Sequence, residues 1–207
     1  MGGAGERAPG ERAPDVVLLG PPNSGKGTQA KVLGELLGVP AISTGEMLRA
    51  AVDEGNELGG RVGGIMKSGE LVDDATMAEV VRERLAKPDA RAGFILDGYP
   101  RTLPQAETLA GILAVSGREV AAAVLVQVPE DTLVRRALGR GRADDREEVL
   151  RERLRVYREK TAPLIGYYRR LGLLREVEGD LPIGEVTLRI VAALGRAAGA
   201  TVAESRG

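Results

Sequence analysis

The segment from Gly20 to Thr28, with the sequence GPPNSGKGT, constrains the fold more than any other part of the chain. It follows an apolar run, Val16 to Leu19, and precedes a helical pattern from Gln29 to Leu37. Glycines in such a loop let successive backbone N–H groups point inward, and the next helix presents its positive end to the same point. Lys26 adds a mobile cation. This strand, loop and helix predict a site that holds the phosphates of a nucleotide.

Two residues of the loop depart from the general pattern. A Ser or Thr usually follows the Lys and binds magnesium, whereas here Gly27 comes first and Thr28 second. Because Mg²⁺ gives up its water reluctantly, we expect phosphates and water to hold it, with no direct protein ligand. Asn23 is expected to adopt a left-handed conformation at a cost of about 1 kcal/mol, which weakens binding without abolishing it.

Apolar runs alternate with helical patterns along the chain. The runs lie at 15–19, near 40–42, at 93–97, 120–128 and 173–178, and the clearest helical patterns run from Thr76 to Leu85 and from Glu147 to Tyr157. This alternation predicts an α/β fold with a five-stranded parallel sheet between two layers of helices. Pro163 is expected to kink or divide the helix that it follows.

The length of 207 residues suits one sizeable domain, which we place at 15–195. Residues 1–14 are expected to form a disordered leader and residues 196–207 a tail. The sequence contains no run of eighteen apolar residues, and its first residues lack the apolar core of a signal peptide. We therefore expect a cytoplasmic protein.

The composition excludes several kinds of chemistry. The chain has no His and no Cys, so a Ser-His-Asp triad, a cysteine nucleophile and a zinc site built from those residues are ruled out. The net charge of −1 gives no reason to expect a nucleic acid polymer or a membrane as partner. Phosphoryl transfer remains, because it depends on positioning and on charge stabilisation by Lys, Arg and Mg²⁺.

The run FILDGYPR, from Phe94 to Arg101, places two charged residues after a buried strand. Asp97 falls at the carboxyl end of that strand, the edge at which α/β sheets bind ligands, and is expected to order magnesium-bound water. Arg101 follows Pro100 in a stiffened turn and can bind phosphate oxygens in a forked geometry. Asp97 as an ordinary turn residue is the simpler alternative.

Four further arginines flank a short glycine-containing segment, Gly139 to Asp145: they are Arg136, Arg140, Arg142 and Arg153. The two glycines permit a hinge, so the segment is a candidate for a loop that closes over a transferring phosphate.

Two segments match helix-capping boxes, Ser43 to Glu46 and Thr102 to Gln105. Capping explains both, and their spacing leaves open whether Thr44 and Gln105 also touch a ligand.

Together these motifs closely resemble the adenylate kinases of the nucleoside monophosphate kinase family, which interconvert ATP plus AMP with two ADP. The resemblance extends over nearly all of 15–195 and rests on GKGTQ at 25–29, ISTGEMLR at 42–49, GELV at 69–72, FILDGYPR at 94–101, GRADD at 141–145 and TAPLIGYY at 161–168.

The resemblance implies a role for each matching position. It implies ATP contacts from Asn23, Ser24, Gly25, Lys26, Gly27, Thr28, Arg136, Arg140 and Leu181. It implies AMP contacts from Thr44, Arg49, Glu70, Leu71, Val72, Gly98, Arg101, Gln105, Arg142 and Arg153, with Gln105 reading the adenine edge. It implies catalytic roles for Lys26, Asp97, Arg101, Arg136, Arg140, Arg142 and Arg153, with Thr28 and Asp97 near the Mg²⁺.

The resemblance also implies a helical lobe for the nucleoside monophosphate at about 43–72 and a short lid at about 139–146. Because Arg140 and Arg142 almost adjoin, the lid resembles the short form and needs no zinc. The family's habit implies a monomer. Asn23 stands where the family usually carries Gly, and Glu46 where it more often carries Asp.

Two alternatives stay open at this point. The first is a pyrimidine monophosphate kinase for UMP or CMP, although those relatives tend to carry Ala and Asn where this chain has Thr44 and Thr102. The second is a nucleotide-binding regulatory protein whose catalysis is impaired through Asn23. Retention of Lys26, Asp97 and the arginines disfavours it, because a pure binder has no need of a transition-state clamp.

Overall fold

Five parallel strands form one sheet in the computed structural model, which describes residues 12–140 and 147–204 but not the side chains of Arg140 and of 196–204. The strands are β1 (Asp15–Leu19), β2 (Ala41–Ser43), β3 (Phe94–Asp97), β4 (Ala122–Gln127) and β5 (Leu174–Glu178). Their order is β2-β3-β1-β4-β5, and every neighbouring pair is parallel. The expected five-stranded parallel sheet is confirmed, with small differences at the strand ends.

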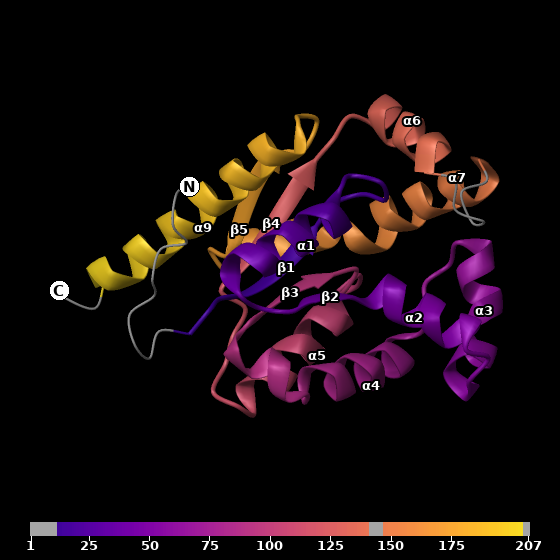
Figure 1. Cartoon of the computed structure of the whole chain (residues 1–207), viewed down its shortest axis with the longest axis horizontal. Coiled ribbons are helices and arrows are strands. Elements are labelled where there is room, and N and C mark those ends of the chain that lie inside the picture. The colour runs from indigo at the N-terminus through magenta and orange to yellow at the C-terminus, as the bar shows by residue number, and fades with distance from the viewer. Residues whose placement is uncertain (1–11, 141–146, 205–207) are drawn as a thin grey trace.

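Helices cover both faces of the sheet (Figure 1). They are α1 (Lys26–Leu37), α2 (Thr44–Asp53), α3 (Glu57–Ser68), α4 (Asp74–Leu85), α5 (Leu103–Ala114), α6 (Glu130–Arg140), α7 (Glu147–Val156), α8 (Pro163–Arg170) and α9 (Ile183–Glu204), with a short 3₁₀ turn at Pro88–Ala92 and a π turn at Tyr157–Thr161.

Alternate residues of each strand enter different cores. Val16 and Leu18 of β1 pack with α1 and α9, for example against Leu33 and Ile190. Val17 and Leu19 pack in the opposite core, which α4, α5 and α8 cover. Because both faces are covered, the strands are apolar almost throughout, as the sequence indicated.

Two smaller groups of helices project beyond the carboxyl ends of the strands. Figure 1 shows α2 and α3 on one side of this edge and α6 and α7 on the other. The α6–α7 pair has a small core of its own, formed by Leu133, Ala137, Leu150 and Leu154. The edge between these groups is where the strand order reverses about β1, the place at which open α/β sheets bind ligands.

The helix expected from Glu147 ends at Val156, and Pro163 begins the next helix. The π turn from Tyr157 to Thr161 joins the two, so Pro163 divides the helical region as expected.

At the start of the described chain, Ala13 is buried and Arg12 pairs with Asp15. Residues 1–11, 141–146 and 205–207 lie outside the described residues. None of the described helices combines the length and the apolar character needed to cross a bilayer.

Candidate active site

The loop between β1 and α1 has the backbone of an anion site. Gly20 and Gly25 have φ angles of 140° and 96°. Helix α1 begins at Lys26, and its N-cap Gly25 provides no side-chain cap. The first N–H groups of α1 therefore have no capping side chain and are available to an anion.

Asn23 takes the left-handed conformation expected of it, with a φ of 66°, the only positive φ of a non-glycine residue in the described chain. Its side-chain oxygen Oδ1 is buried and has no hydrogen-bond partner there. The loop therefore carries both a backbone cost and an unsatisfied acceptor at this residue.

Lys26 folds over the loop from which it comes. Its ammonium donates to the carbonyl oxygens of Gly20 and Pro21 at 2.8 and 2.7 Å. The charge therefore lies at the centre of the loop, within reach of a bound polyphosphate.

Asp97 ends β3, and its carboxylate lies beside the loop. Its Oδ2 is 3.5 Å from the Ser43 hydroxyl. A Cβ at Gly27 would lie 3.4 Å from the same oxygen, so glycine at this position lets the carboxylate approach the first turn of α1. The Asp97 carboxylate therefore stands next to the phosphate loop, as its strand-end position predicted.

Three arginines from separate elements gather on the other side of Asp97. Burial lowers the pKa of Arg101, Asp97 opposes this shift, and the positive charges of Arg153 and Arg49 add to it. The Nε of Arg101 donates to the carbonyl of Gly98 at 2.8 Å, which fixes the guanidinium in place. Like charges held together in this way make a second candidate anion site, because a bound anion would relieve their repulsion.

Gly98 is required by this geometry. Its φ is 85°, and a Cβ there would lie 2.7 Å from the Thr44 hydroxyl oxygen. Thr44 is itself buried, with its hydroxyl 3.4 Å from the Asp97 carbonyl. Glycine thus allows the end of β3 to approach the start of α2.

The cap half of both expected capping boxes is present, whereas the Glu46 side chain pairs with Lys31 at 3.0 Å in place of the return bond to the cap N–H. Ser43 accepts from the Glu46 N–H at 3.4 Å, and Thr102 accepts from the Gln105 N–H at 3.3 Å. The Gln105 side chain is buried and makes two hydrogen bonds. Its Oε1 accepts from the Arg101 N–H at 2.8 Å, and its Nε2 donates to Asp74 Oδ1 at 2.7 Å. Sequence reasoning missed Asp74, whose signal was an acidic residue in the first turn of α4.

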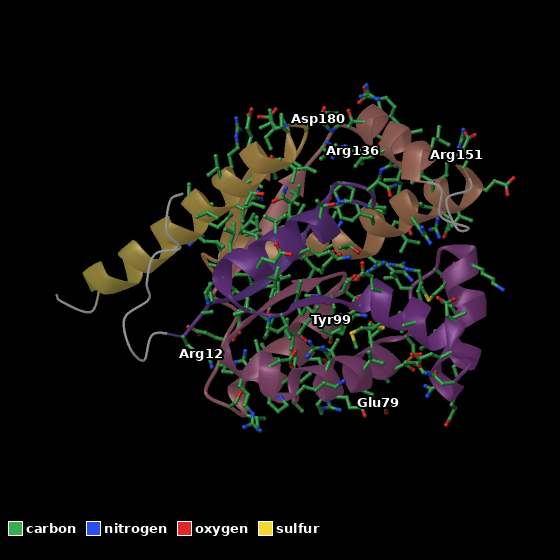
Figure 2. The ribbon with its side chains drawn as sticks, viewed as in Figure 1. Arg12, Glu79, Tyr99, Arg136, Arg151 and Asp180 are labelled. Carbon is green, nitrogen blue, oxygen red and sulfur yellow. The ribbon has the colours of Figure 1, made fainter. Side chains whose placement is uncertain are left out.

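Arg136 connects α6 to the phosphate loop. Its guanidinium donates to the Ser24 carbonyl at 3.3 Å and to the Gly179 carbonyl at 3.0 Å, and it pairs with Asp180 at 3.3 Å. Figure 2 shows Arg136 and Asp180 near each other, where β4 and β5 lead into α6 and α9.

On the same side, the buried Gln29 joins α1 to the start of α9. Its Nε2 donates to the Ile183 carbonyl at 3.0 Å, and its Oε1 accepts from the Thr187 hydroxyl at 2.8 Å. These two hydrogen bonds hold the start of α9 against α1, next to Leu181.

A cavity of about 910 Å³ joins the two candidate anion sites. Its lining includes these sequence-predicted residues: Asn23, Ser24, Gly25, Lys26, Gly27, Thr28, Thr44, Arg49, Glu70, Leu71, Val72, Asp97, Gly98, Arg101, Gln105, Arg136, Arg153 and Leu181. Arg142 and the side chain of Arg140 lie outside the described residues.

The C-terminal end of α3 lies against α7 in the wall of the cavity, which Gly69 and Arg153 both line. A Cβ at Gly69, which ends α3, would lie 3.1 Å from the Val149 carbonyl and 3.4 Å from Cγ of Arg153. The cavity therefore lies between the two projecting groups of helices, with one anion site at β1 and the other next to α2 and α7.

Comparison with known proteins agrees with this geometry. The family model described as adenylate kinase matches residues 18–173, which include β2, β3, β4 and the cavity-lining residues from Leu18 to Thr161. The chain belongs to the adenylate kinase family.

Individual relatives support the same assignment. An adenylate kinase of Mycobacteroides abscessus is 47% identical over 181 residues, which cover 87% of this chain and 99% of the relative. Adenylate kinases of Thermobifida fusca and Xylella fastidiosa are each 48% identical; the matches cover 86% and 87% of this chain and 97% and 98% of the relatives. The family resemblance drawn from the motifs is thus confirmed.

Proposed function

We infer that this protein transfers the terminal phosphoryl group of ATP to AMP and gives two ADP. The observation that carries this inference is the pair of anion sites in one cavity, one formed by the phosphate loop and the other by Arg49, Arg101 and Arg153. Two phosphate-bearing substrates can therefore bind head to head. Family membership supplies the class of reaction.

ATP is assigned to the side of the phosphate loop. The N–H groups at the start of α1 would hold its β- and γ-phosphates, and the Lys26 ammonium would exchange the loop carbonyls for phosphate oxygens. Arg136 already donates a hydrogen bond to the Ser24 carbonyl of the loop and would face the same phosphates. Leu181, in the cavity wall next to α9, is the residue we assign to the adenine of ATP.

AMP is assigned to the side of the arginines. Arg49, Arg101 and Arg153 would hold its phosphate, and the segment Glu70 to Val72 with Thr44 would surround its base. Gln105 is assigned to the Watson–Crick edge of the adenine, because it retains one N–H and one lone pair beyond its two bonds in the described structure.

The geometry supports direct transfer. Phosphoryl transfer needs an in-line approach and neutralisation of the charge on the equatorial oxygens, and no covalent protein intermediate. Lys26 and the arginines on both sides supply that positive charge without proton transfer. Arg140 and Arg142 are assigned to the same clamp, and the segment between α6 and α7 to a lid that excludes water from the reaction.

Magnesium is proposed to enter with ATP. Among the described residues no cluster of three or more carboxylates offers a dedicated site. The Asp97 carboxylate beside the phosphate loop suits an ion held mainly by phosphate oxygens and water, with Thr28 in the same cavity wall. When bound, the ion neutralises phosphate charge.

The protein is proposed to act as a monomer, since one chain supplies both anion sites. AMP is proposed as the preferred acceptor over CMP or UMP, because this chain has Thr44 and Thr102 where pyrimidine kinases tend to carry Ala and Asn.

Arg101→Lys tests the assignment of the second anion site. Lysine keeps the charge but loses the forked donor geometry. We expect the KM for AMP to rise at least about tenfold while the KM for ATP changes less than about twofold, since a charge-assisted phosphate contact is worth about 1.5–3 kcal/mol. Arg91→Lys, an exposed site on the 3₁₀ turn, is the control. Equal changes in both KM values would contradict the assignment.

A further inference from the structure

A small hydrogen-bonded network stands behind the base-reading glutamine. Asp74 Oδ1, at the first residue of α4, accepts from Gln105 Nε2 at 2.7 Å and from the Thr102 hydroxyl at 3.0 Å. On its other side, Gln105 Oε1 accepts from the Arg101 N–H at 2.8 Å. Gln105 is 2% exposed, so these bonds are shielded from water.

Chemistry allows only one orientation of the Gln105 amide in this network. A carboxylate can only accept, so it must face the NH₂ group, and a backbone N–H can only donate, so it must face the carbonyl oxygen. If the amide rotated by 180°, its oxygen would face the Asp74 carboxylate, so that two acceptors met. Its NH₂ group would face the Arg101 N–H, so that two donors met. Each mismatch would leave a buried polar group unsatisfied.

A glutamine amide without such neighbours cannot distinguish adenine from a 6-oxopurine. Adenine presents a 6-amino donor and an N1 acceptor. Hypoxanthine presents a 6-oxo acceptor and an N1–H donor in the same places. Either pattern pairs with a primary amide, which needs only to rotate to exchange its oxygen and nitrogen.

We propose that Asp74 is a positioning residue for acceptor specificity, which locks the Gln105 amide in the orientation that accepts adenine and rejects 6-oxopurines. The proposal rests on the assignment of Gln105 to the base of AMP. In the locked orientation, Oε1 accepts from the 6-amino group and Nε2 donates to N1. A 6-oxopurine in the same pose faces like groups at both atoms.

The surroundings of Asp74 suit its role as an acceptor. Its carboxylate lies at the first residue of α4, and two donors point at Oδ1. Tyr99 lies nearby and is 1% exposed; burial, followed by the charge of Asp74, raises the pKa of its hydroxyl to about 12. Figure 2 shows Tyr99 on the side of the sheet that faces α4.

The test compares AMP with inosine monophosphate, which differs at the 6-position and at N1. The readout is the ratio of kcat/KM for AMP to that for inosine monophosphate, with magnesium-ATP as donor. In Asp74→Ala this ratio is expected to fall at least about tenfold, because only the Arg101 N–H then opposes rotation of the amide and the site rejects the wrong pattern less well. The kcat with saturating AMP and the KM for ATP should change less than about twofold.

Asp74→Asn is the conservative variant. Its side-chain oxygen can accept both bonds that Oδ1 accepts, so the ratio should stay within about threefold of wild type. If Asp74→Ala does not fold, Asp74→Ser carries the same prediction, since its hydroxyl is one bond too short to reach Gln105 and still suits a helix start.

Asp73→Ala is the matched control. Asp73 is the N-cap of the same helix, and its Oδ1 accepts from the Thr76 N–H at 2.8 Å without contact to Gln105. This variant weakens the N-terminal end of α4 but should leave the ratio of kcat/KM for AMP to that for inosine monophosphate unchanged. An equal fall of the ratio in Asp73→Ala would show that helix integrity, and not amide orientation, sets specificity, and would overturn the proposal.

Gln105→Ala separates this proposal from the assignment on which it rests. If Gln105→Ala leaves the ratio unchanged, Gln105 does not read the base and both fail. If Gln105→Ala lowers the ratio while Asp74→Ala does not, Gln105 reads the base without help from Asp74, and only the present proposal fails. The proposal is supported if the ratio falls in both Gln105→Ala and Asp74→Ala while Asp74→Asn stays near wild type.

Discussion

Replacing Asn23 with glycine is expected to stabilise the protein, although the residue lies in the phosphate loop. Asn23 has a φ of 66°, and its Oδ1 is buried without a partner in the described structure. Glycine adopts this φ freely and brings no polar atom. Both costs therefore disappear in Asn23→Gly.

The size of the effect follows from three contributions. Relief of the left-handed backbone is worth about 1 kcal/mol, somewhat less for Asn than for other residues. Removal of an unsatisfied buried acceptor is worth about 1 kcal/mol or more. The greater freedom of glycine in the unfolded chain opposes these by about 0.4–1 kcal/mol. The free energy of unfolding should therefore rise by about 1 kcal/mol.

Urea denaturation of both proteins without nucleotide measures this difference, provided that the m-value is unchanged. Asn56→Gly is the matched control. Asn56 has a φ of −74°, and its side chain accepts from the Gly59 N–H at 2.9 Å as the cap of α3. That variant should lose about 0.5–1 kcal/mol. A loss of stability in Asn23→Gly would refute the reasoning and show that the Asn23 side chain makes a favourable contact.

Other substitutions test other parts of the structure. Lys26→Ala should lower kcat at least about 100-fold in the ADP-formation assay, since a transition-state charge contact is worth about 3 kcal/mol; retention of a tenth of the wild-type rate would contradict its role. Arg118→Leu should lower the free energy of unfolding by about 3 kcal/mol, because Arg118 and Asp15 form a buried ion pair at the opposite end of the sheet; a loss below about 1 kcal/mol in urea would contradict this. Burial, with the nearby charge of Asp74, raises the pKa of Tyr99 from 10.0 to about 12, so its contribution to stability is present below pH 10 and lost as pH rises toward 12. Denaturation at pH 9 and pH 12 should show about 2 kcal/mol of this loss, and Tyr99→Phe should lack that part of the decrease.

The features that sequence analysis predicted well are local ones. The strands appear as apolar runs because both faces of the sheet are covered, and the phosphate loop depends on neighbouring glycines. The N-caps Ser43 and Thr102 each accept from an N–H three residues further on, and Pro163 starts α8 as its fixed φ requires. Each of these signals lies within one short segment.

The features that it missed depend on distant segments. Asp74 meets Gln105 only after α4 and α5 pack together, and in the sequence it is indistinguishable from an ordinary acid in a first helical turn. The Asp15–Arg118 pair joins the start of β1 to the segment before β4. The bond between Gln29 and Thr187 likewise joins α1 to α9. No periodicity within a segment encodes such pairs.

The most direct test of the central claim is the initial rate of ADP formation with magnesium-ATP and, in parallel, AMP, CMP, UMP or GMP at matched concentrations. Adenylate kinase activity with the proposed assignment of Thr44 and Gln105 predicts a rate with AMP far above the other three. A preference for CMP or UMP would contradict the acceptor assignment while preserving the fold and the chemistry, and no ADP with any acceptor would contradict the activity itself.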